Sequence, residues 1–411
     1  MSQSHRSGGP VLSVLDMVPV SAGRTRRDAL EEMVDLARCA EAAGYRRYWL
    51  AEHHGSTTYL SSATTVLMGQ VLAATERIGV CSGGIMLPNH APLVIAEQIG
   101  TLATLHPSRV GLGLGRAPGT DRLTAAALRR RNASPRHFVE EILEILTYLG
   151  AVPQEGDGAV PGSLLLGAEA AAPSASATSP TSPAAAPGGQ RSCAIQPGAA
   201  GAGTPTAGAP EGTAPEGPLR AAPARVRAIP GEGTAPAVWI LGSSVNGARV
   251  AGSLGLPFAV ASHFAPSQAG AAITSYRSVF DAQAPTSQGC PRIAAAVNAV
   301  VAPTAQEADL LFSTAMAAAA RIIGARPGPL DPPDPAPGAW RALAPGREAM
   351  VEGAMALSYV GAPDDVAAGL RDLAARWDLD EILVVCHVHD AAARRRSYEL
   401  LAQAMARPAA G

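Results

Sequence analysis

The sequence predicts a (β/α)8 barrel, the TIM-barrel class of α/β fold, interrupted by a disordered Ala/Pro/Gly-rich insertion. Eight short segments rich in Val, Ile and Leu alternate with segments of helical periodicity. Each predicted strand is almost continuously apolar, as parallel strands covered by helices require. A doubly wound sheet usually has about five or six strands, so eight repeats favour the barrel.

The first strand, 11–18, is followed by a predicted helix over 26–44, in which Leu30, Met33 and Ala37 recur at spacings of three or four residues. Apolar positions at this spacing form one face of a helix, and Gly44 ends it. The other strands are predicted at 45–53, 78–87, 109–115, 237–243, 258–264, 292–302 and 381–388. Further helices are predicted at 91–105, 137–149, 245–255, 305–323 and 364–377.

The low-complexity segment 150–223 divides the barrel into a first half, 1–149 with strands one to four, and a second half, 224–411 with strands five to eight. This segment is nearly all Ala, Pro, Gly, Ser and Thr. Such residues bury too little apolar surface to offset an ordering cost of roughly 1–2 kcal/mol per residue, so we expect disorder. A second Pro-rich stretch, 326–340, is predicted to be a mobile loop. The longer loop 326–347, which contains it, is predicted to be a lid over the barrel mouth.

The composition excludes several functions. All 32 basic residues are Arg, so the chain has no Lys for a Schiff base or for a P-loop. A net charge of -2 argues against general binding to nucleic acid or to a membrane surface. The five Cys form no C-x-x-C pair, and the first ten residues lack an apolar core. We therefore predict a cytoplasmic protein with reduced thiols.

Polar residues at the strand ends are the candidates for chemistry, because active sites of such barrels lie there. Asp16 ends the first strand, and Glu52, His53 and His54 end the second. Alternation along a strand places Glu52 and His54 on one side and His53 on the other. The remaining strand ends carry Ser82, Asn89, His90, Arg116, Ser243, Ser244, His263, His387 and His389.

Glu52 and the histidines near it could in principle bind a metal ion. We expect no metal, because the first strands of the chain carry no further histidines or carboxylates at the spacing of metal ligands. His90 is equally compatible with an ordinary loop histidine near a helix start.

The ends of the fourth and fifth strands suggest a phosphate site. Arg116 can form a bidentate contact with a dianion, and Ser243 and Ser244 stand where a helix begins, so free N–H groups face any bound anion. A rim salt bridge for Arg116 and a plain N-cap for the serines remain open. The stretch GLGLGRAPGTD lacks the G-x-G-x-x-G spacing of a dinucleotide fingerprint.

Gly83 and Gly84 interrupt the third predicted strand. Two glycines weaken a buried strand, and they usually mark a close approach of a ligand or an unusual peptide geometry. A flat ring lying against this bare backbone would explain them.

The stretches YWLAEHH, SGGIMLPNHAPL, GLGLGRAPGTD, WILGSS and LGLPFAV resemble the bacterial luciferase-like flavin-dependent monooxygenase family. The resemblance covers about 11–149 and 225–407 and implies a barrel that binds reduced FMN, or in some branches a deazaflavin, at its C-terminal mouth. It implies that His53 is the catalytic histidine and that a non-prolyl cis peptide at Gly83-Gly84 supports the flavin ring. It also implies that Arg116 and Ser244 hold the flavin phosphate. Asp16 and Ser243 complete the predicted cofactor-binding set, although luciferase-type sequences carry a carboxylate at position 243.

The resemblance further implies oxygenation of a small organic substrate by O2, with His53 as acid and base, and a homodimer. The chain shows no second nucleotide-binding fingerprint, so we expect a separate flavin reductase to supply the reduced flavin. Two alternatives stay open: a deazaflavin-dependent hydride-transfer dehydrogenase and a non-catalytic flavin-binding protein.

Overall fold

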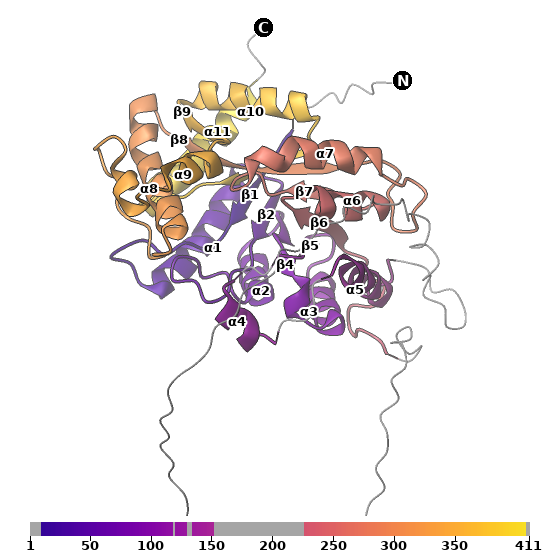
Figure 1. The fold of residues 1–411 in the computed structure, drawn as a ribbon. Helices are drawn as coiled ribbons and strands as arrows, with labels where there is room; N and C mark the ends of the chain where they lie inside the picture. Colours follow the sequence, from indigo (N-terminus) through magenta and orange to yellow (C-terminus); the bar gives the residue numbers. More distant parts are fainter. Residues whose placement is uncertain (1–9, 118–119, 130–133, 152–225, 408–411) are drawn as a thin grey trace, which may run out of the picture. The chain divides into compact units, whose positions relative to one another are not determined.

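Eight parallel strands close into a barrel, and helices surround it (Figure 1). The computed structural model describes residues 10–117, 120–129, 134–151 and 226–407. Each barrel strand pairs with the next in chain order, and the last pairs with both its predecessor and the first, which closes the barrel. The predicted fold is confirmed. The strands are β1 (Val11–Asp16), β2 (Arg47–Leu50), β3 (Gly79–Ser82), β5 (Val110–Gly115), β6 (Ala237–Gly242), β7 (Phe258–Val260), β8 (Ile293–Val301) and β10 (Glu381–Val385).

Two short strands depart from the predicted pattern. The strand expected over 78–87 is broken at Gly83-Gly84 into β3 and β4 (Ile85–Met86), and β4 pairs with β5. The strand β9 (Ser358–Gly361) was not predicted and pairs with the C-terminal part of β8. The predicted strand 258–264 ends at Val260, because Ser262 N turns back to donate to Val260 O at 2.9 Å. These departures lie at the C-terminal ends of the strands, where the chain forms the barrel mouth.

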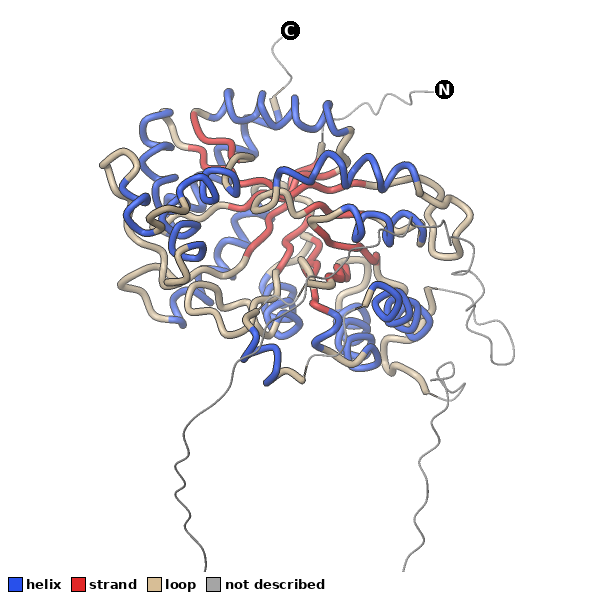
Figure 2. Tube along the Cα trace, viewed as in Figure 1, coloured by secondary structure: helices blue, strands red, loops and turns tan. Residues whose placement is uncertain are grey.

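The helices cover the outer face of the strands (Figure 2). The sequence predicted those with a strong apolar period: α1 (Arg26–Ala42), α3 (Pro92–Leu105), α5 (Pro135–Tyr148), α6 (Val245–Ser253), α8 (Ala305–Ile323) and α10 (Pro363–Trp377). It missed α2 (Thr64–Ala74), α4 (Arg122–Ala127), α7 (Ala269–Ser278), α9 (Glu348–Ala354) and α11 (Ala391–Ala406). Several of these are short or rich in small residues, so packing against the barrel decides them more than their own periodicity does.

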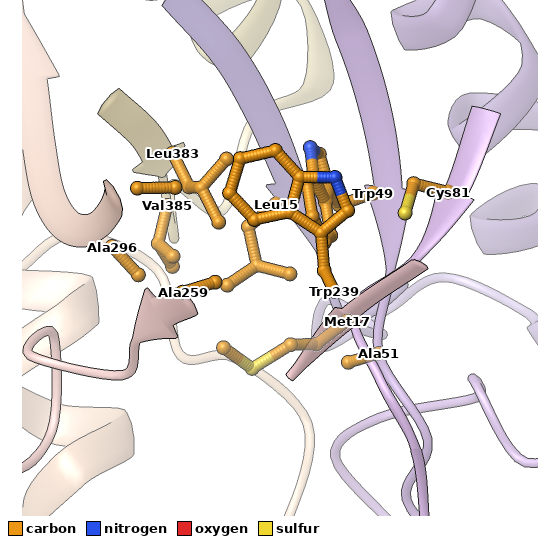
Figure 3. Packing of buried hydrophobic residues seen from close by; sticks show 11 residues of the cluster. Leu15, Met17, Trp49, Ala51, Cys81, Trp239, Ala259, Ala296, Leu383 and Val385 are labelled. Carbon is orange, nitrogen blue, oxygen red and sulfur yellow. The ribbon is translucent and has the colours of Figure 1, made fainter. Parts of the chain in front are cut away.

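Large side chains fill the barrel interior (Figure 3). Trp49 and Trp239 meet edge to face with ring centroids 5.5 Å apart, and both are fully buried. Leu15 on β1 and Met17, which directly follows this strand, also point inward. At the N-terminal end, the buried carboxylate of Glu381 accepts hydrogen bonds from Ser13 Oγ at 2.5 Å and Trp49 Nε1 at 3.1 Å. The interior is therefore a packed core, and only its C-terminal mouth is left for chemistry.

Gly100 on α3 packs closely against Gly231 outside the barrel, and a substitution there can test this contact. A Cβ at Gly100, on α3, would lie 2.4 Å from the Cα of Gly231, whereas a Cβ at Gly270, on α7, would meet nothing within 4 Å. We expect Gly100→Ala to lower the free energy of unfolding by about 1–3 kcal/mol through overpacking. Gly270→Ala, its matched control, should raise this free energy by roughly 0.5–1 kcal/mol. Urea denaturation checks both signs, and equal effects of the two variants would contradict the predicted contact.

The predicted lid, 326–347, begins with residues fixed to the loop after β1. Leu330 is fully buried, and its N–H donates to Val20 O at 2.7 Å while its carbonyl accepts from Ala22 N at 2.8 Å. Asp331 pairs with Arg321 of α8 through contacts of 2.6 and 2.9 Å. The start of this stretch is thus anchored beside the mouth.

The predicted insertion 150–223 lies outside the described residues apart from its first two. Among the helices that the structure describes, none has the length and apolarity needed to cross a bilayer.

Candidate active site

His53 follows β2 and lies at the C-terminal mouth of the barrel. Trp49 and Ala51 belong to the interior cluster, and the two-residue period of the strand carries His53 to the same inner face. Its backbone N–H donates to Ser61 O at 3.0 Å, and its ring lies 5.3 Å from that of Tyr59. The Nδ1 atom is buried without a hydrogen-bond partner. Burial lowers the pKa of His53 to about 4, so its imidazole is neutral at pH 7.

Two more histidines reach the mouth by the same alternation. His387 follows the inward-facing Val385, and its ring stacks on Tyr59 with centroids 5.4 Å apart. His263 follows β7 and is buried, and its Nδ1 also lacks a partner. Asn298 Nδ2, from β8, donates to His263 O at 2.7 Å and fixes this turn.

The ring of Tyr59 lies beside both His53 and His387, so two of the three imidazoles share one neighbour. Burial, with His387 and His53 adding to it, lowers the pKa of His263 to about 3. Burial likewise lowers the pKa of His387 to about 4. The sequence places His263 and His387 at strand ends but indicates no role for them, and it does not point to Tyr59 or Asn298. Every second residue of a barrel strand faces the interior, and extending this alternation to each strand's C-terminal end identifies the two histidines and Asn298.

Asp16 is a correction to the predicted cofactor-binding set. Leu15 and Met17 point into the barrel, so Asp16 points outward and is fully buried beneath the helices. Its carboxylate accepts from Arg394 Nη2 of α11 at 2.7 Å and from the hydroxyl of Tyr48. An enclosed carboxylate committed to these partners cannot reach a ligand at the mouth.

Glu52 is the centre of a buried hydrogen-bond cluster on the outer side of the mouth. Its carboxylate accepts from His54 Nε2 at 2.8 Å, His90 Nε2 at 3.0 Å, Asn89 Nδ2 at 3.0 Å and Met86 N at 3.1 Å. The alternation that paired Glu52 with His54 is confirmed. The cluster ties the end of β2 to β4 and to the turn η1 (Leu87–Asn89).

The prediction that Glu52 and its neighbouring histidines lack a further group at ligand spacing is wrong. His90 supplies a third group, and within the described ranges Glu52, His54 and His90 form one set at ligand spacing. The carboxylate already accepts four donors, however, and these donors satisfy its oxygens in the present geometry. We interpret the cluster as a hydrogen-bonded anchor for two mouth loops.

The Glu52 cluster predicts a specific loss of stability in acid. Burial alone would raise the pKa of Glu52, but hydrogen bonds from His54 and His90 lower it from 4.5 to about 2. The stabilisation is therefore complete above pH 4.5 and is lost as the pH falls towards 2. We expect Glu52→Gln to cost about 1.5–3 kcal/mol at pH 7 and to show a flatter acid limb in urea denaturation.

The matched control for Glu52 is Glu31→Gln. Glu31 is exposed on α1 and pairs with Arg27 at 2.8 Å. An exposed pair of this kind contributes little, so the control should follow the wild-type curve between pH 7 and pH 2. An unchanged acid limb in Glu52→Gln would show that Glu52 does not carry this effect.

The Gly83-Gly84 peptide is cis, as the resemblance implies. A Cβ at Gly83 would lie 2.8 Å from Leu15 Cδ1, and one at Gly84 would lie 2.8 Å from the carbonyl oxygen of Gly113. Close packing within the barrel therefore already requires both glycines. Contact of this backbone with a flavin ring remains a proposal.

The predicted phosphate residues lie on neighbouring strand ends. Arg116 directly follows β5 and Ser243 directly follows β6, and the register pairs Gly115 with Leu241. Ser244 is the N-cap of α6, and its Oγ accepts from Gly247 N at 3.5 Å. The N-cap interpretation is thus confirmed, and it is compatible with an anion at the same helix terminus.

The family profile described as luciferase-like monooxygenase matches residues 11–158 and 211–379. The chain belongs to the luciferase-like monooxygenase family. The chain is 35% identical over 389 residues to the luciferase-like monooxygenase of Escherichia coli K12, covering 94% of the chain and 95% of the relative. The crystal structure of apo-MsnO8 matches with a TM-score of 0.72 and 28% identity, over 96% of this chain and 98% of that one. The protein is accordingly an oxidoreductase.

More distant structures share the fold of this chain. The oxygenating constituent of 3,6-diketocamphane monooxygenase from Pseudomonas putida, solved in complex with FMN, has a TM-score of 0.60 and 16% identity, over 97% of this chain and 98% of that one. An F420-dependent secondary alcohol dehydrogenase has a TM-score of 0.58 and 11% identity, over 97% of this chain and 99% of that one. At these identities the similarity concerns the barrel alone.

Proposed function

We propose that this protein is a flavin-dependent monooxygenase that uses reduced FMN and O2 to oxygenate a small organic substrate. The observation that carries the proposal is His53: a neutral imidazole at the mouth, whose buried Nδ1 has no partner in the protein. Native proteins rarely leave a buried polar atom unpaired unless a ligand or a catalytic role accounts for it.

The residues at the mouth fit a flavin. Arg116, Ser243 and the N-terminus of α6 would hold its phosphate, and the cis Gly83-Gly84 backbone would lie against its ring. When bound, reduced FMN supplies the electrons that activate O2.

The chain's own residues would transfer protons and exclude water from the site. His53 presents a neutral ring at pH 7, and no protein donor occupies the lone pair at Nδ1, so this atom can take up and return a proton. Tyr59 and His387 pack beside it and limit the access of water.

A second candidate is a deazaflavin-dependent dehydrogenase. The fold similarity to an F420-dependent secondary alcohol dehydrogenase favours keeping it, since the same barrel serves that cofactor there. The same His53 would then act as a base towards an alcohol.

One titration separates the two candidates. The purified protein is mixed with reduced FMN or with reduced deazaflavin, and binding and O2 uptake are followed. Binding of FMN with accelerated O2 uptake supports the monooxygenase, whereas binding of the deazaflavin alone refutes it.

We also propose that a separate reductase supplies the reduced FMN and that the protein is a homodimer. Efficient oxidation of NADH by the pure protein in the presence of FMN would contradict the first part. A monomer in analytical ultracentrifugation at micromolar concentration would contradict the second.

A further inference from the structure

Glu52, His54 and His90 bring three metal-binding atoms together beside the barrel mouth. Glu52 and His54 follow β2, and His90 is the C-cap of η1. His54 Nε2 lies 2.8 Å from Glu52 Oε1, and His90 Nε2 lies 3.0 Å from both carboxylate oxygens. The three ligand atoms all lie within 4.8 Å of one another. Two separate segments of the chain thus supply one compact set of donor atoms.

This donor set matches an ion of the zinc class. Two imidazole nitrogens and one carboxylate oxygen are a combination that binds Zn²⁺, whereas Mg²⁺ and Ca²⁺ take mainly oxygen ligands in larger number. At zinc–ligand distances of about 2.0–2.2 Å, the ligand atoms of a tetrahedral ion lie about 3.3–3.6 Å apart. The contacts between the imidazoles and the carboxylate would therefore widen by only about half an ångström to admit the ion.

Other contacts hold the Glu52 carboxylate in place without the imidazoles. Met86 N donates to Oε2 at 3.1 Å, and Asn89 Nδ2 donates to Oε1 at 3.0 Å. Because each carboxylate oxygen can accept more than one contact, these two hydrogen bonds are compatible with an ion on the imidazole side. Donors of this kind orient a ligating carboxylate and increase the affinity for the metal.

The two imidazoles form the accessible side of the cluster. The side chain of Glu52 is 1% exposed, whereas those of His54 and His90 are 13% and 27% exposed. An ion can therefore enter from solvent past the imidazoles. Each imidazole can carry its single proton on Nδ1, which makes Nε2 the ligand atom. The ion and the Nε2–H hydrogen bonds are thus alternatives at the same two nitrogens.

We propose that Glu52, His54 and His90 form a binding site for a divalent ion of the zinc class, with water as the fourth ligand. Three protein ligands and one exchangeable position are an arrangement that Zn²⁺ adopts in proteins. The ion connects the end of β2 to η1, the same segments that the hydrogen bonds join. Because η1 follows β4 and the Gly83-Gly84 peptide, the ion fixes a segment that borders the mouth. The site requires no flavin and is independent of the proposed function.

The test is a calorimetric titration of the full-length, untagged protein with ZnCl2 and with MgCl2 at pH 7.5, after treatment with EDTA and its removal. We expect one Zn²⁺ per chain with a Kd below about 10 µM, and Mg²⁺ binding at least about 100-fold weaker. The melting temperature should rise with the concentration of Zn²⁺. Co²⁺ in place of Zn²⁺ should give the visible absorption spectrum of a four-coordinate ion.

Substitutions of the ligands locate the ion. His54→Ala and His90→Ala should each weaken Zn²⁺ binding by at least about 100-fold, and Asn89→Ala, which removes a supporting donor, by about tenfold. His137→Ala is the matched control, because His137 is an exposed histidine on α5 whose Nδ1 contacts Ser134 Oγ at 2.8 Å. This control should bind Zn²⁺ as the wild type does.

Circular dichroism shows whether each variant folds. If His54→Ala does not fold, His90→Ala, at the more exposed ligand, decides; if neither folds, the spectrum of the Co²⁺ protein decides. The proposal is overturned if Zn²⁺ does not bind, if Mg²⁺ binds as tightly, or if the Co²⁺ spectrum is that of a six-coordinate ion. Unchanged Zn²⁺ binding in a folded His54→Ala or His90→Ala would also overturn it, because the ion would then lie elsewhere. Failure of FMN to bind would refute the proposed function and leave this result unaffected.

Discussion

Replacing His53 by Asn is expected to lower the rate of oxygenation by about 10²–10⁴-fold, which is the usual contribution of a positioned acid or base. Asn keeps a polar group of similar size but cannot exchange a proton near neutral pH. Flavin affinity should stay within about twofold, because the predicted phosphate contacts come from other strands. Stopped-flow oxidation of reduced FMN, combined with product and peroxide assays, separates binding from chemistry.

His106→Asn is the control for this experiment, since His106 follows α3 at the opposite end of the barrel from the mouth. It should leave both flavin binding and turnover unchanged. Loss of flavin binding in His53→Asn would show that His53 holds the cofactor, and normal turnover would remove it from the chemistry altogether.

Replacing Arg394 by Met is expected to destabilise the protein by about 3–5 kcal/mol, because it leaves Asp16 as a buried charge without its cation. Arg394 donates from Nη2 to Asp16 at 2.7 Å and from Nε to Cys386 O at 2.8 Å, and its side chain is 8% exposed. The pair joins α11 to the end of β1. Calorimetry or urea denaturation at pH 7 measures the loss.

Arg396→Met on the same helix is the matched control. Arg396 is exposed and lies 3.5 Å from Glu399, so its removal should cost at most about 1 kcal/mol. The double variant Asp16→Leu/Arg394→Met should regain much of the lost stability, because no unpaired charge remains. Equal effects of Arg394→Met and Arg396→Met would contradict this account.

The apolar segments of the chain show how much of the fold the sequence determined. Continuous apolar runs such as 109–115 and 292–302 predicted strands and, by their repetition, the barrel, because a parallel strand must be apolar on both faces. The two-residue alternation of side chains along a strand placed His53 on the side opposite Glu52 and His54. The hydrogen bond between Glu52 and His54 confirms that these two share a side. The resemblance identified the family and led to the cis peptide at Gly83-Gly84.

Tertiary structure decided how the strand-end residues are used. Asp16 and Glu52 both end apolar strands. Asp16 pairs with Arg394, which lies 378 positions away in the chain, whereas Glu52 accepts a hydrogen bond from His90 of a different loop. Such partners depend on which strands become neighbours and which way each residue faces. The sequence by itself thus determined the barrel and the inward position of His53. Only the closed barrel brought His263 and His387 towards it, because burial and register act between segments that are distant along the chain.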